Sequence, residues 1–548
     1  MVTPVSHHLS ALTRYPSNSL SPCFRPNDAA AAMAWLSVTA PPGELRLYVL
    51  CLYFGIGASV WGYNIGVMST VLSNKGFGEA IGSPDMPSKG IIISVYYLGT
   101  SISYLLLSHP VSDWLGRRYA ALSGTVVVCL GAILQGVSNG AIGFGTMVAG
   151  RVISGLGVAI VSTSVPLYQA EISPAQKRGH FVTVNHVGFI AGIATGLWVG
   201  FFMRFWTSSV GHFWGWRLSI LLEIIPALMF GLGLPWIPET PRWLVEHSRK
   251  DQARLTLRWL REGSFDDEQI EHEFGAIIDN VNEYRQSGRN WLSLFKEKAL
   301  FARLWRATLL QFMAQLCGAS AIKYYLPYLL EGLGLSMRAA VMATAIEMTF
   351  KIFFTILEMF IIDRFGRRNC LAAGCAVMAF SLLINGVLPL EYGYGINKTA
   401  SVVCIIFMFV YAMGFSIGFG PVAWVYNTEI FPTSVRARGL NFASVGGSLG
   451  ATIVTMGWSY GLSFLDSYSY FIFMAINIIC IPVIYAFLPE TKGRELEDMD
   501  ELFGAVDKPR TNSDAASTHL LQDDAPYRDP EDSATGTTRD EDRNLSLI

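Results

Sequence analysis

The sequence predicts an all-α membrane protein whose twelve transmembrane helices form two six-helix bundles, each a pseudo-repeat of the other. Hydrophobic residues make up 51% of the 548-residue chain and charged residues 15%, a balance typical of polytopic membrane proteins. The signature Asp-x-x-Gly-Arg-Arg occurs at 113–118 and at 363–368, and Pro-Glu-Thr occurs at 238–240 and at 489–491. Two pairs in the same order, 250 and 251 residues apart, indicate that one unit was duplicated.

Residues 44–237 are assigned to the first bundle and residues 303–489 to the second, because the apolar runs fall into two groups of six. A bilayer core of about 30 Å needs about 20 apolar residues of helix. The first group of runs lies near 46–74, 89–110, 119–138, 144–168, 179–203 and 216–236. The second group lies near 304–330, 338–362, 370–390, 400–427, 438–463 and 468–488.

Three segments lie outside the two bundles. Residues 238–302 include polar stretches that interleave Glu, Arg and Lys, which predicts a helical linker rather than a separate domain. Residues 1–43 are rich in Ser and Pro and are expected to form a disordered leader. Residues 490–548 are predicted to form a tail that is disordered from about 505 onward, where Asp, Ser and Thr predominate.

Arginine and lysine gather in alternate connections between the spans, at 117–118, 177–178, 364–368 and 436–438. By the positive-inside rule these connections, the linker and both termini are predicted to be cytoplasmic. We expect a multi-pass protein that works as a monomer in the lipid bilayer of the plasma membrane. Asn397-Lys398-Thr399 then falls on the outer side, where Asn397 is a candidate for N-linked glycosylation.

The sequence carries no pattern that predicts an enzyme, a metal site or a nucleic-acid-binding protein. Its eight cysteines are scattered singly, without metal spacing or a disulfide ladder. Gly418-Phe419-Gly420 lies in a predicted span without a following strand and helix, so it is not read as a phosphate-binding loop. We therefore expect no catalytic residue, cofactor or metal, and a small-molecule solute as the partner.

Several motifs follow one another in a characteristic order. The fourth span carries Gly150-Arg151, and residues 166–179 follow the order Pro-x-Tyr-x-x-Glu-x-x-Pro-x-x-x-Arg-Gly. Pro-Glu-Thr-Pro-Arg-Trp-Leu (238–244) follows the sixth span, and Gly420-Pro421 marks the tenth. In these motifs the chain resembles the sugar porter family of the major facilitator superfamily, in a fungal-type form, over about residues 45–503. The resemblance implies the major facilitator fold and transport by alternating access.

Acids and arginines gather at the predicted cytoplasmic ends of the spans. Ion pairs in such a half-wet interface form and break easily, each contributing about 1 kcal/mol or less. Several such pairs together can hold one face of a bundle closed and release it again. Alternatively, the arginines only determine the orientation of the spans in the membrane. The family usually has Gly where this chain has His109, which leaves close helix approach there an open question. The candidate gate residues are Asp113, Arg117, Arg118, Glu171, Arg178, Glu239, Arg242, Asp363, Arg367, Arg368, Glu429 and Arg436.

Charged groups inside the spans are candidates for coupling, because burying a charge in a bilayer is costly. In proton-coupled sugar porters an Asp on the first span faces an Arg on the fourth, here Arg151, and in this chain the matching position is Asn64. An amide does not take up protons near neutral pH, so coupling through the first span is not expected. Three other residues are alternative candidates for coupling, namely Glu223, Glu347 and His186. At the position of Glu223 the family normally has Gln.

The resemblance also implies a cavity wall that is altered in this chain. Several family amides are replaced, and Lys323 and Lys351 add positive charge. We therefore expect the solute to be a sugar or a polyol or, alternatively, an organic acid or a specialised metabolite. A nontransporting nutrient sensor is the remaining alternative. The candidate solute-binding residues are Asn64, His186, Gln315, Ser320, Tyr324, Tyr325, Lys351 and Trp424, and the candidate cavity charges are Arg151, Glu223, Lys323 and Glu347.

Overall fold

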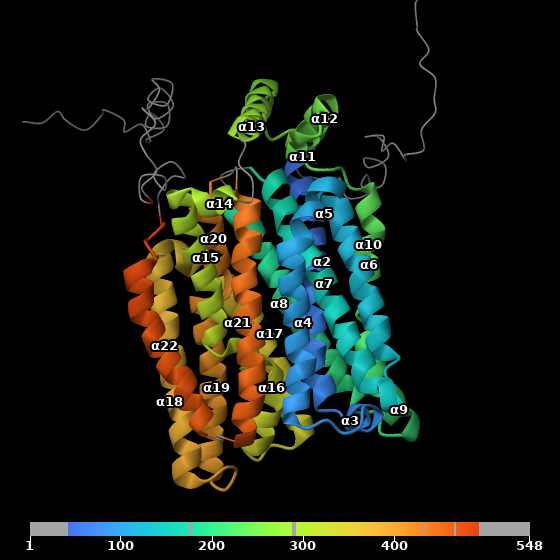
Figure 1. Ribbon diagram of the computed structural model, residues 1–548, viewed down its shortest axis with the longest axis vertical. Helices are drawn as coiled ribbons and strands as arrows, with labels where there is room; N and C mark the ends of the chain where they lie inside the picture. The colour runs from blue at the N-terminus through green and yellow to red at the C-terminus, as the bar shows by residue number, and fades with distance from the viewer. Residues whose placement is uncertain are drawn as a thin grey trace, which may run out of the picture.

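The computed structural model describes residues 42–174, 178–287, 292–432, 435–464, 467–492 and 503. Residues 1–41 and 504–548, where the leader and most of the tail are expected, lie outside the described residues. The described part of the chain consists of helices and their connections, and contains no strand. Two helical bundles stand side by side, with the short linker helices gathered at one end (Figure 1).

The first bundle follows the predicted spans closely. Its second span is α4, after which the short α5 lies at the end of the span, and its sixth span is divided into α9 and α10 at Leu222-Glu223. Short helices α3 (Lys75–Ala80) and η2 (Gly140–Ile142) join its spans at the end away from the linker. The other elements are α2 (Pro42–Leu72), α4 (Met86–Leu106), α5 (Ser108–Leu115), α6 (Arg117–Gly136), α7 (Gly143–Ile172), α8 (Arg178–Met203), α9 (Ser209–Leu221), α10 (Ile224–Gly233) and η4 (Leu234–Trp236).

The second bundle contains two divided spans. The seventh breaks at Gly318, which has φ +100° and favours glycine, and the tenth breaks at Phe419, just before Gly420-Pro421. Proline lacks an N–H and suits the first turn of a new helix. The elements are α15 (Lys298–Leu316), α16 (Ala319–Gly332), α17 (Met337–Phe365), α18 (Arg367–Tyr392), α19 (Lys398–Gly418), α20 (Gly420–Ile430), α21 (Arg436–Phe464) and α22 (Tyr468–Phe487).

Ten helical segments of the described chain are long and apolar enough to cross a membrane. The divided pair α15–α16 and the 29-residue α21 are the other two predicted spans. The predicted all-α architecture of twelve spans in two bundles is confirmed.

The linker helices are α11 (Pro241–Glu246), α12 (Lys250–Arg261), α13 (Asp267–Ser287) and α14 (Ser293–Lys296). Because α15 begins at Lys298, the second bundle starts a few residues earlier than the expected boundary at 303. We call the end of the molecule that carries α11–α13 the linker face, and the other end the opposite face (Figure 1). The two bundles meet mainly where α4 packs against α21 and α8 against α17.

Candidate functional site

A cavity of about 420 Å³ lies between the two bundles, within the size range of small-molecule sites. Trp61 and Tyr97 line it from the first bundle, and Phe415 and Trp424 from the second. Aromatic walls of this kind can stack against a flat or ring-shaped solute.

Five of the residues predicted to form the solute cavity line it. Four of them were predicted to bind solute, and Lys323 was predicted as a cavity charge. The Ser320 hydroxyl donates to Gln315 Oε1, so part of the hydrogen-bonding capacity of this pair is used within the protein. The five residues are His186, Gln315, Ser320, Lys323 and Trp424.

The other candidate solute-binding residues lie outside the lining of this cavity. Tyr324 and Tyr325 are fully buried, and the Tyr324 hydroxyl lies 3.3 Å from that of Tyr97. Asn64 is 1% exposed and held by neighbouring side chains. Lys351 places its ammonium group 4.6 Å from the centroid of the Phe415 ring. Their assignment to solute binding stays a prediction.

Three amides that the sequence reasoning missed also line the cavity: Asn185, Gln311 and Asn441. Each has one buried polar atom without a hydrogen-bond partner in the described part of the chain, Asn185 Oδ1, Gln311 Nε2 and Asn441 Nδ2. A buried polar atom left unpaired is costly, so these atoms are suited to binding a polar solute. Gln311 lies one helical turn before Gln315, and this spacing was the available signal.

The cavity extends from the middle of the molecule to the linker face. Its lining includes Ala170 near the end of α7, Glu429 near the end of α20, and Arg436 and Ala437 at the start of α21. Arg436, a predicted gate residue, donates from Nε to the Phe431 carbonyl at 3.3 Å. The cavity therefore reaches the linker face in this conformation.

Toward the opposite face the bundles are joined by direct contacts. Ser69 of α2 donates to the Tyr324 carbonyl of α16 at 3.1 Å. Tyr328 of α16 donates to the Leu72 carbonyl, and Lys89 of α4 donates to the Tyr328 hydroxyl at 3.1 Å. These contacts close the cavity toward the opposite face.

The predicted coupling residues of the first bundle form one buried network. Arg151 donates from Nη1 to Asn64 Oδ1 at 2.6 Å, and the Asn64 amide donates to both carboxylate oxygens of Glu223 at 3.0 Å. Arg151 also lies over the Tyr96 ring, 4.3 Å from its centroid. Because α9 ends at Leu221 and α10 begins at Ile224, the Glu223 carboxyl sits at the break in the sixth span.

The predicted charges of the second bundle gather around α17. Glu347 and Lys351 lie one turn apart on this helix and line a separate cavity of about 260 Å³ with aromatic residues of α17 and α19. Both Lys351 and Lys323 act electrostatically on Glu347. Lys323 thus lies near an acid while also lining the main cavity.

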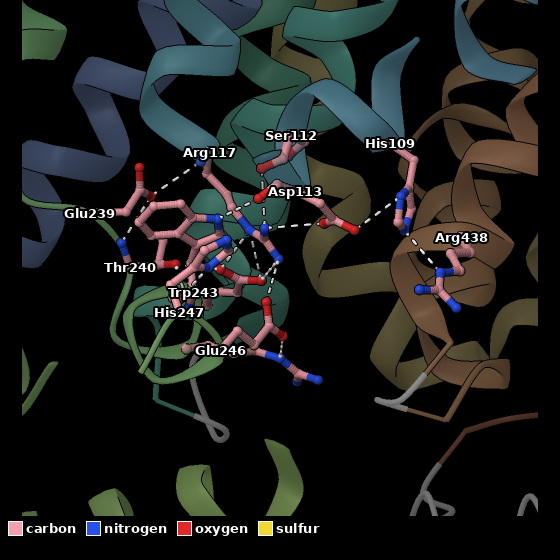
Figure 2. Close-up of polar contacts among 12 residues, drawn as sticks. His109, Ser112, Asp113, Arg117, Glu239, Thr240, Trp243, Glu246, His247 and Arg438 are labelled. Atoms are coloured by element: carbon pink, nitrogen blue, oxygen red, sulfur yellow. Dashed lines mark hydrogen bonds and ion pairs between the residues drawn. The ribbon is translucent and has the colours of Figure 1, made fainter. Parts of the chain in front are cut away.

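At the linker face, Arg117 at the start of α6 binds acids from three elements (Figure 2). Its guanidinium donates to Glu171 of α7 at 3.0–3.3 Å and to Asp113 of α5 at 3.3 Å, and it lies 3.6 Å from Glu246 of α11. The Arg117 side chain is only 4% exposed. A charge at this depth needs such partners, because an unpaired buried charge is strongly destabilising.

Glu239, which follows η4, caps the start of α6 with its carboxylate (Figure 2). It accepts the backbone N–H groups of Arg117 at 3.2 Å, Arg118 at 3.3 Å and Thr240 at 3.0 Å. Burial raises the pKa of Glu239 to about 7, and these N–H groups and arginines oppose the rise. Gly116 has φ +89°, and a Cβ there would lie 2.4 Å from Glu239 Oε2, so only glycine fits beside the cap.

The second bundle repeats this arrangement. Arg367 donates to Glu429 at 2.8 Å, and Glu490 accepts the backbone N–H groups of Arg367 at 2.9 Å and Arg368 at 3.0 Å. Gly366 has φ +86°, and a Cβ there would lie 2.7 Å from Glu490 Oε2. The duplicated signature therefore builds the same capped arginine site in each bundle.

The predicted gate residues pair both between neighbouring helices and within one helix. Glu171 of α7 pairs with Arg117 of α6, and Arg242 lies 3.3 Å from Glu246 of the same helix. Two further predicted gate residues have side chains that lie outside the described part of the chain, namely Arg178 and Asp363.

His109 bridges the two bundles at the linker face (Figure 2). Its Nδ1 lies 3.1 Å from Asp113 Oδ2, and its Nε2 accepts a hydrogen bond from Arg438 Nε of α21 at 3.1 Å. A guanidinium can only donate, so His109 is neutral, with its proton on Nδ1. Burial, with Arg438 and Arg117 nearby, lowers the pKa of His109 to about 3. The helices do approach closely at this departure from the family pattern.

Asn397, the predicted glycosylation site, is exposed at the start of α19 on the opposite face. Its Oδ1 accepts the backbone N–H groups of Thr399 at 3.0 Å and Ala400 at 3.4 Å. The amide nitrogen, to which a glycan would be attached, is not used in this cap. Glycosylation stays a prediction.

Comparison with known proteins places the chain among carriers. The family model described as "Sugar (and other) transporter" matches residues 50–503. "MFS-type transporter criB" of Aspergillus cristatus is 30% identical over 462 residues, covering 84% of this chain and 94% of that protein. "Sugar transport protein MST3" of Oryza sativa subsp. japonica is 28% identical over 481 residues, covering 84% and 91%.

Solved structures share the fold. The xylose transporter XylE from E. coli, in a partially occluded inward-open conformation, aligns with a TM-score of 0.70 at 23% identity, covering 82% of this chain and 99% of that one. The family match is consistent with the two-bundle fold and with the duplicated sites at the linker face. The chain belongs to the sugar transporter family and has the major facilitator fold.

Proposed function

We propose that this protein moves a small polar solute across a membrane by alternating access. The observation that carries the proposal is the cavity between the bundles, which reaches the linker face while contacts between α2, α4 and α16 close the opposite face. In alternating access one central site opens to each side in turn as the two bundles rock. A cavity walled by both bundles changes its opening when they do so.

We assign the linker face to the cytoplasmic side of the plasma membrane. In this membrane the protein is proposed to work as a monomer. The arginine-rich ends of the spans support this orientation, since Arg117, Arg118, Arg367 and Arg368 all lie at this face. The first helix begins there and the last ends there, so both termini are cytoplasmic. The described conformation is then inward-facing.

A sugar or polyol is the first candidate for the solute. Asn185, Gln311 and Asn441 offer unpaired polar atoms around the cavity, and Trp424 offers a ring face. A polyhydroxylated solute needs directional hydrogen bonds to replace its water. Sugar transport among the relatives, such as the rice protein, supports the same class.

Proton coupling through the first helix is not part of the proposal. Asn64 occupies the position that faces Arg151, and its amide already donates to Glu223. Any coupling would instead use an acid or histidine elsewhere, with Glu223, Glu347 and His186 as the candidates from the sequence.

An organic acid is the second candidate solute, favoured by one observation. Lys323 lines the main cavity, and a cation in a membrane-embedded cavity attracts a carboxylate. The amides that favour a sugar can also bind a hydroxy acid, so the two candidates differ in the role of Lys323.

Uptake assays test these proposals in cells that lack their own carriers, using labelled hexoses, polyols and carboxylic acids with and without a protonophore. If the solute is an acid, Lys323→Met abolishes its uptake, whereas Lys75→Met, a change at an exposed lysine, leaves it intact. If the solute is a sugar, Gln311→Ala and Asn441→Ala reduce uptake more than Lys323→Met does. If nothing in the panel moves although the protein reaches the cell surface, transport is ruled out for these solutes and a nutrient sensor becomes the better interpretation.

A further inference from the structure

Glu358 is a buried acid in the eighth span that neither the family motifs nor the candidate sites include. It lies on α17 and is 0% exposed. In the described part of the chain, neither of its carboxylate oxygens has a hydrogen-bond partner. An ionised carboxylate without partners is among the least favourable groups in a membrane protein interior.

The Glu358 carboxyl faces the break in the tenth span. A Cβ added to Gly420, the first residue of α20, would lie 3.1 Å from Glu358 Oε2 and 3.6 Å from His186 Nε2. The N–H of Val422 in the first turn of α20 is directed toward the carboxyl group. Glu358 of the second bundle and His186 of the first therefore both lie close to the start of α20.

The acid lies near a route to solvent at the start of α20. His186 and Gly420 both line the main cavity, which extends to the linker face. Glu358 itself does not line that cavity, but His186, which lies near the same end of α20, does. The imidazole nitrogen is a group that can accept a proton and pass it on.

Few charged groups face Glu358. Lys351, two helical turns earlier on α17, acts on it electrostatically but places its ammonium over the Phe415 ring. Residues of α19 and α20 at this point, Phe415, Gly420 and Val422, carry no charge. The titratable groups that the structure places near Glu358 are His186 of α8, Lys351 of α17 and Cys370 of α18.

We propose that Glu358 is a proton-binding residue whose protonation sets the balance between the conformations of this carrier, with His186 as its link to the cavity. In the described conformation Glu358 carries the proton and is neutral. On release its O–H bond breaks, His186 Nε2 accepts the proton, and water in the cavity removes it toward the linker face. Among the described residues, the carboxylate left behind has only the Val422 N–H directed toward it and no cation beside it, which favours rearrangement of α17, α20 and α8.

Proton binding by Glu358 can be measured without any solute. Only the role of this proton in a transport cycle rests on the proposed carrier function. The first measurement is infrared spectroscopy of the purified full-length protein in lipid nanodiscs, in H₂O and D₂O. A protonated carboxyl group gives a C=O band separate from that of a carboxylate and shifted by deuteration. Glu358→Gln is expected to remove one component of this band, whereas Glu347→Gln and Glu223→Gln retain that component. An unchanged band in Glu358→Gln overturns the proposal.

The second measurement is the labelling rate of a cysteine in the cavity, Ser444→Cys, as a function of pH. Ser444 lies on α21 and lines the cavity, so its labelling reports how far the linker face is open. The rate is expected to depend on pH, by up to about tenfold per pH unit, the limit for one proton. The thiolate fraction of the cysteine and the titration of His109 contribute the same pH dependence to every background, so the backgrounds are compared with one another. Glu358→Gln is expected to reduce the pH dependence relative to the parent, and Glu358→Asp, which keeps the acid, retains it in full. An identical pH dependence in Glu358→Gln and its parent overturns the proposal, while failure of solute uptake alone would count only against the carrier function.

Discussion

Arg438 of the second bundle donates from Nε to Nε2 of His109 of the first bundle at 3.1 Å, while His109 Nδ1 lies 3.1 Å from Asp113. The arginine sites built by the duplicated signature each bind acids of their own bundle. The His109–Arg438 contact, in contrast, must break if the bundles separate at the linker face. Its strength therefore bears directly on how far this face opens.

Acidification is expected to weaken the His109–Arg438 contact. Because burial, Arg438 and Arg117 lower the pKa of His109 to about 3, the folded contact contains neutral His109. Its stabilisation is complete above the ordinary histidine pKa of about 6.5 and falls by about 1.4 kcal/mol for each pH unit below it. Protonated His109 also has no acceptor for Arg438.

Spin labels at two exposed linker-face positions, Trp114 and Leu292, can measure this opening by double electron–electron resonance spectroscopy. We expect the distance distribution to lengthen between about pH 7.5 and about pH 5.5, through the ordinary titration range of histidine. His109→Gln, which keeps an acceptor for Arg438, removes the part of the pH response that His109 causes. His212→Asn, at an exposed histidine on the opposite face, serves as the control and leaves the response unchanged. An identical response in His109→Gln and the unmodified protein contradicts the assignment.

Replacing the signature glycines with alanine is expected to destabilise both bundles. Gly116 and Gly366 have positive φ, and an added Cβ would lie 2.4 Å and 2.7 Å from the capping carboxylates of Glu239 and Glu490. The left-handed conformation alone costs a residue with a Cβ about 1–2 kcal/mol, and displacement of the cap adds to this. Gly140 also has positive φ but open space around it. Thermal unfolding in detergent should therefore rank Gly140→Ala as the mildest of the three variants, and equal losses would exclude a role for the caps.

Removing the charge of the acids that bind the two signature arginines should also destabilise the protein. Hydrogen bonds to charged groups contribute about 1.5–3 kcal/mol each, so Glu171→Gln and Glu429→Gln should lower the free energy of unfolding by about that amount. Glu171→Gln should cost more, because the Glu171 side chain is 7% exposed and that of Glu429 is 28% exposed.

The matched control for these two variants is Glu271→Gln in the linker. Glu271 pairs with Arg254 and Arg258, whose side chains are about half exposed, and exposed pairs contribute about 0–1 kcal/mol. Chemical unfolding followed by circular dichroism measures all three variants. If Glu271→Gln costs as much as Glu171→Gln, burial of the arginine site does not determine its strength.

The architecture was predictable from the sequence because its signals are local and repeated. Long apolar runs give the spans, and the two copies of the signature give the pseudo-repeat, down to the matching sites of Arg117 and Arg367. The breaks in the seventh and tenth spans were not predicted, although Gly318 and Gly420-Pro421 are usable signals for them. These features depend on backbone preferences that neighbouring residues determine.

The partners within the site were not predictable, because they come from distant parts of the chain. Glu171 pairs with Arg117, 54 residues away, and His109 meets Arg438, 329 residues away. Glu358 is a different case, since an acid inside an apolar span was a usable signal and only its unpaired state needed the structure.

Asn64→Asp is expected to destabilise the first bundle unless Glu223 is changed with it. The Asn64 amide donates to both oxygens of Glu223 at 3.0 Å and accepts from Arg151 at 2.6 Å. An aspartate keeps the contact with Arg151 but cannot donate, and it brings a second negative charge against Glu223 in a buried site. Loss of a hydrogen bond to a charged group costs about 1.5–3 kcal/mol, before the repulsion is counted.

The double variant Asn64→Asp with Glu223→Gln should recover most of this loss, because a glutamine amide can donate to the new carboxylate. Thermal unfolding of the two single variants and the double variant forms a double-mutant cycle, and residues in one network typically couple by about 0.5–3 kcal/mol. Combining Asn64→Asp with Glu347→Gln is the control, since Glu347 belongs to the second bundle, and these effects should add. Additive losses in both cycles would mean that Asn64 and Glu223 do not act as one unit. The hydrogen bonds from Asn64 would then not determine whether Glu223 is ionised.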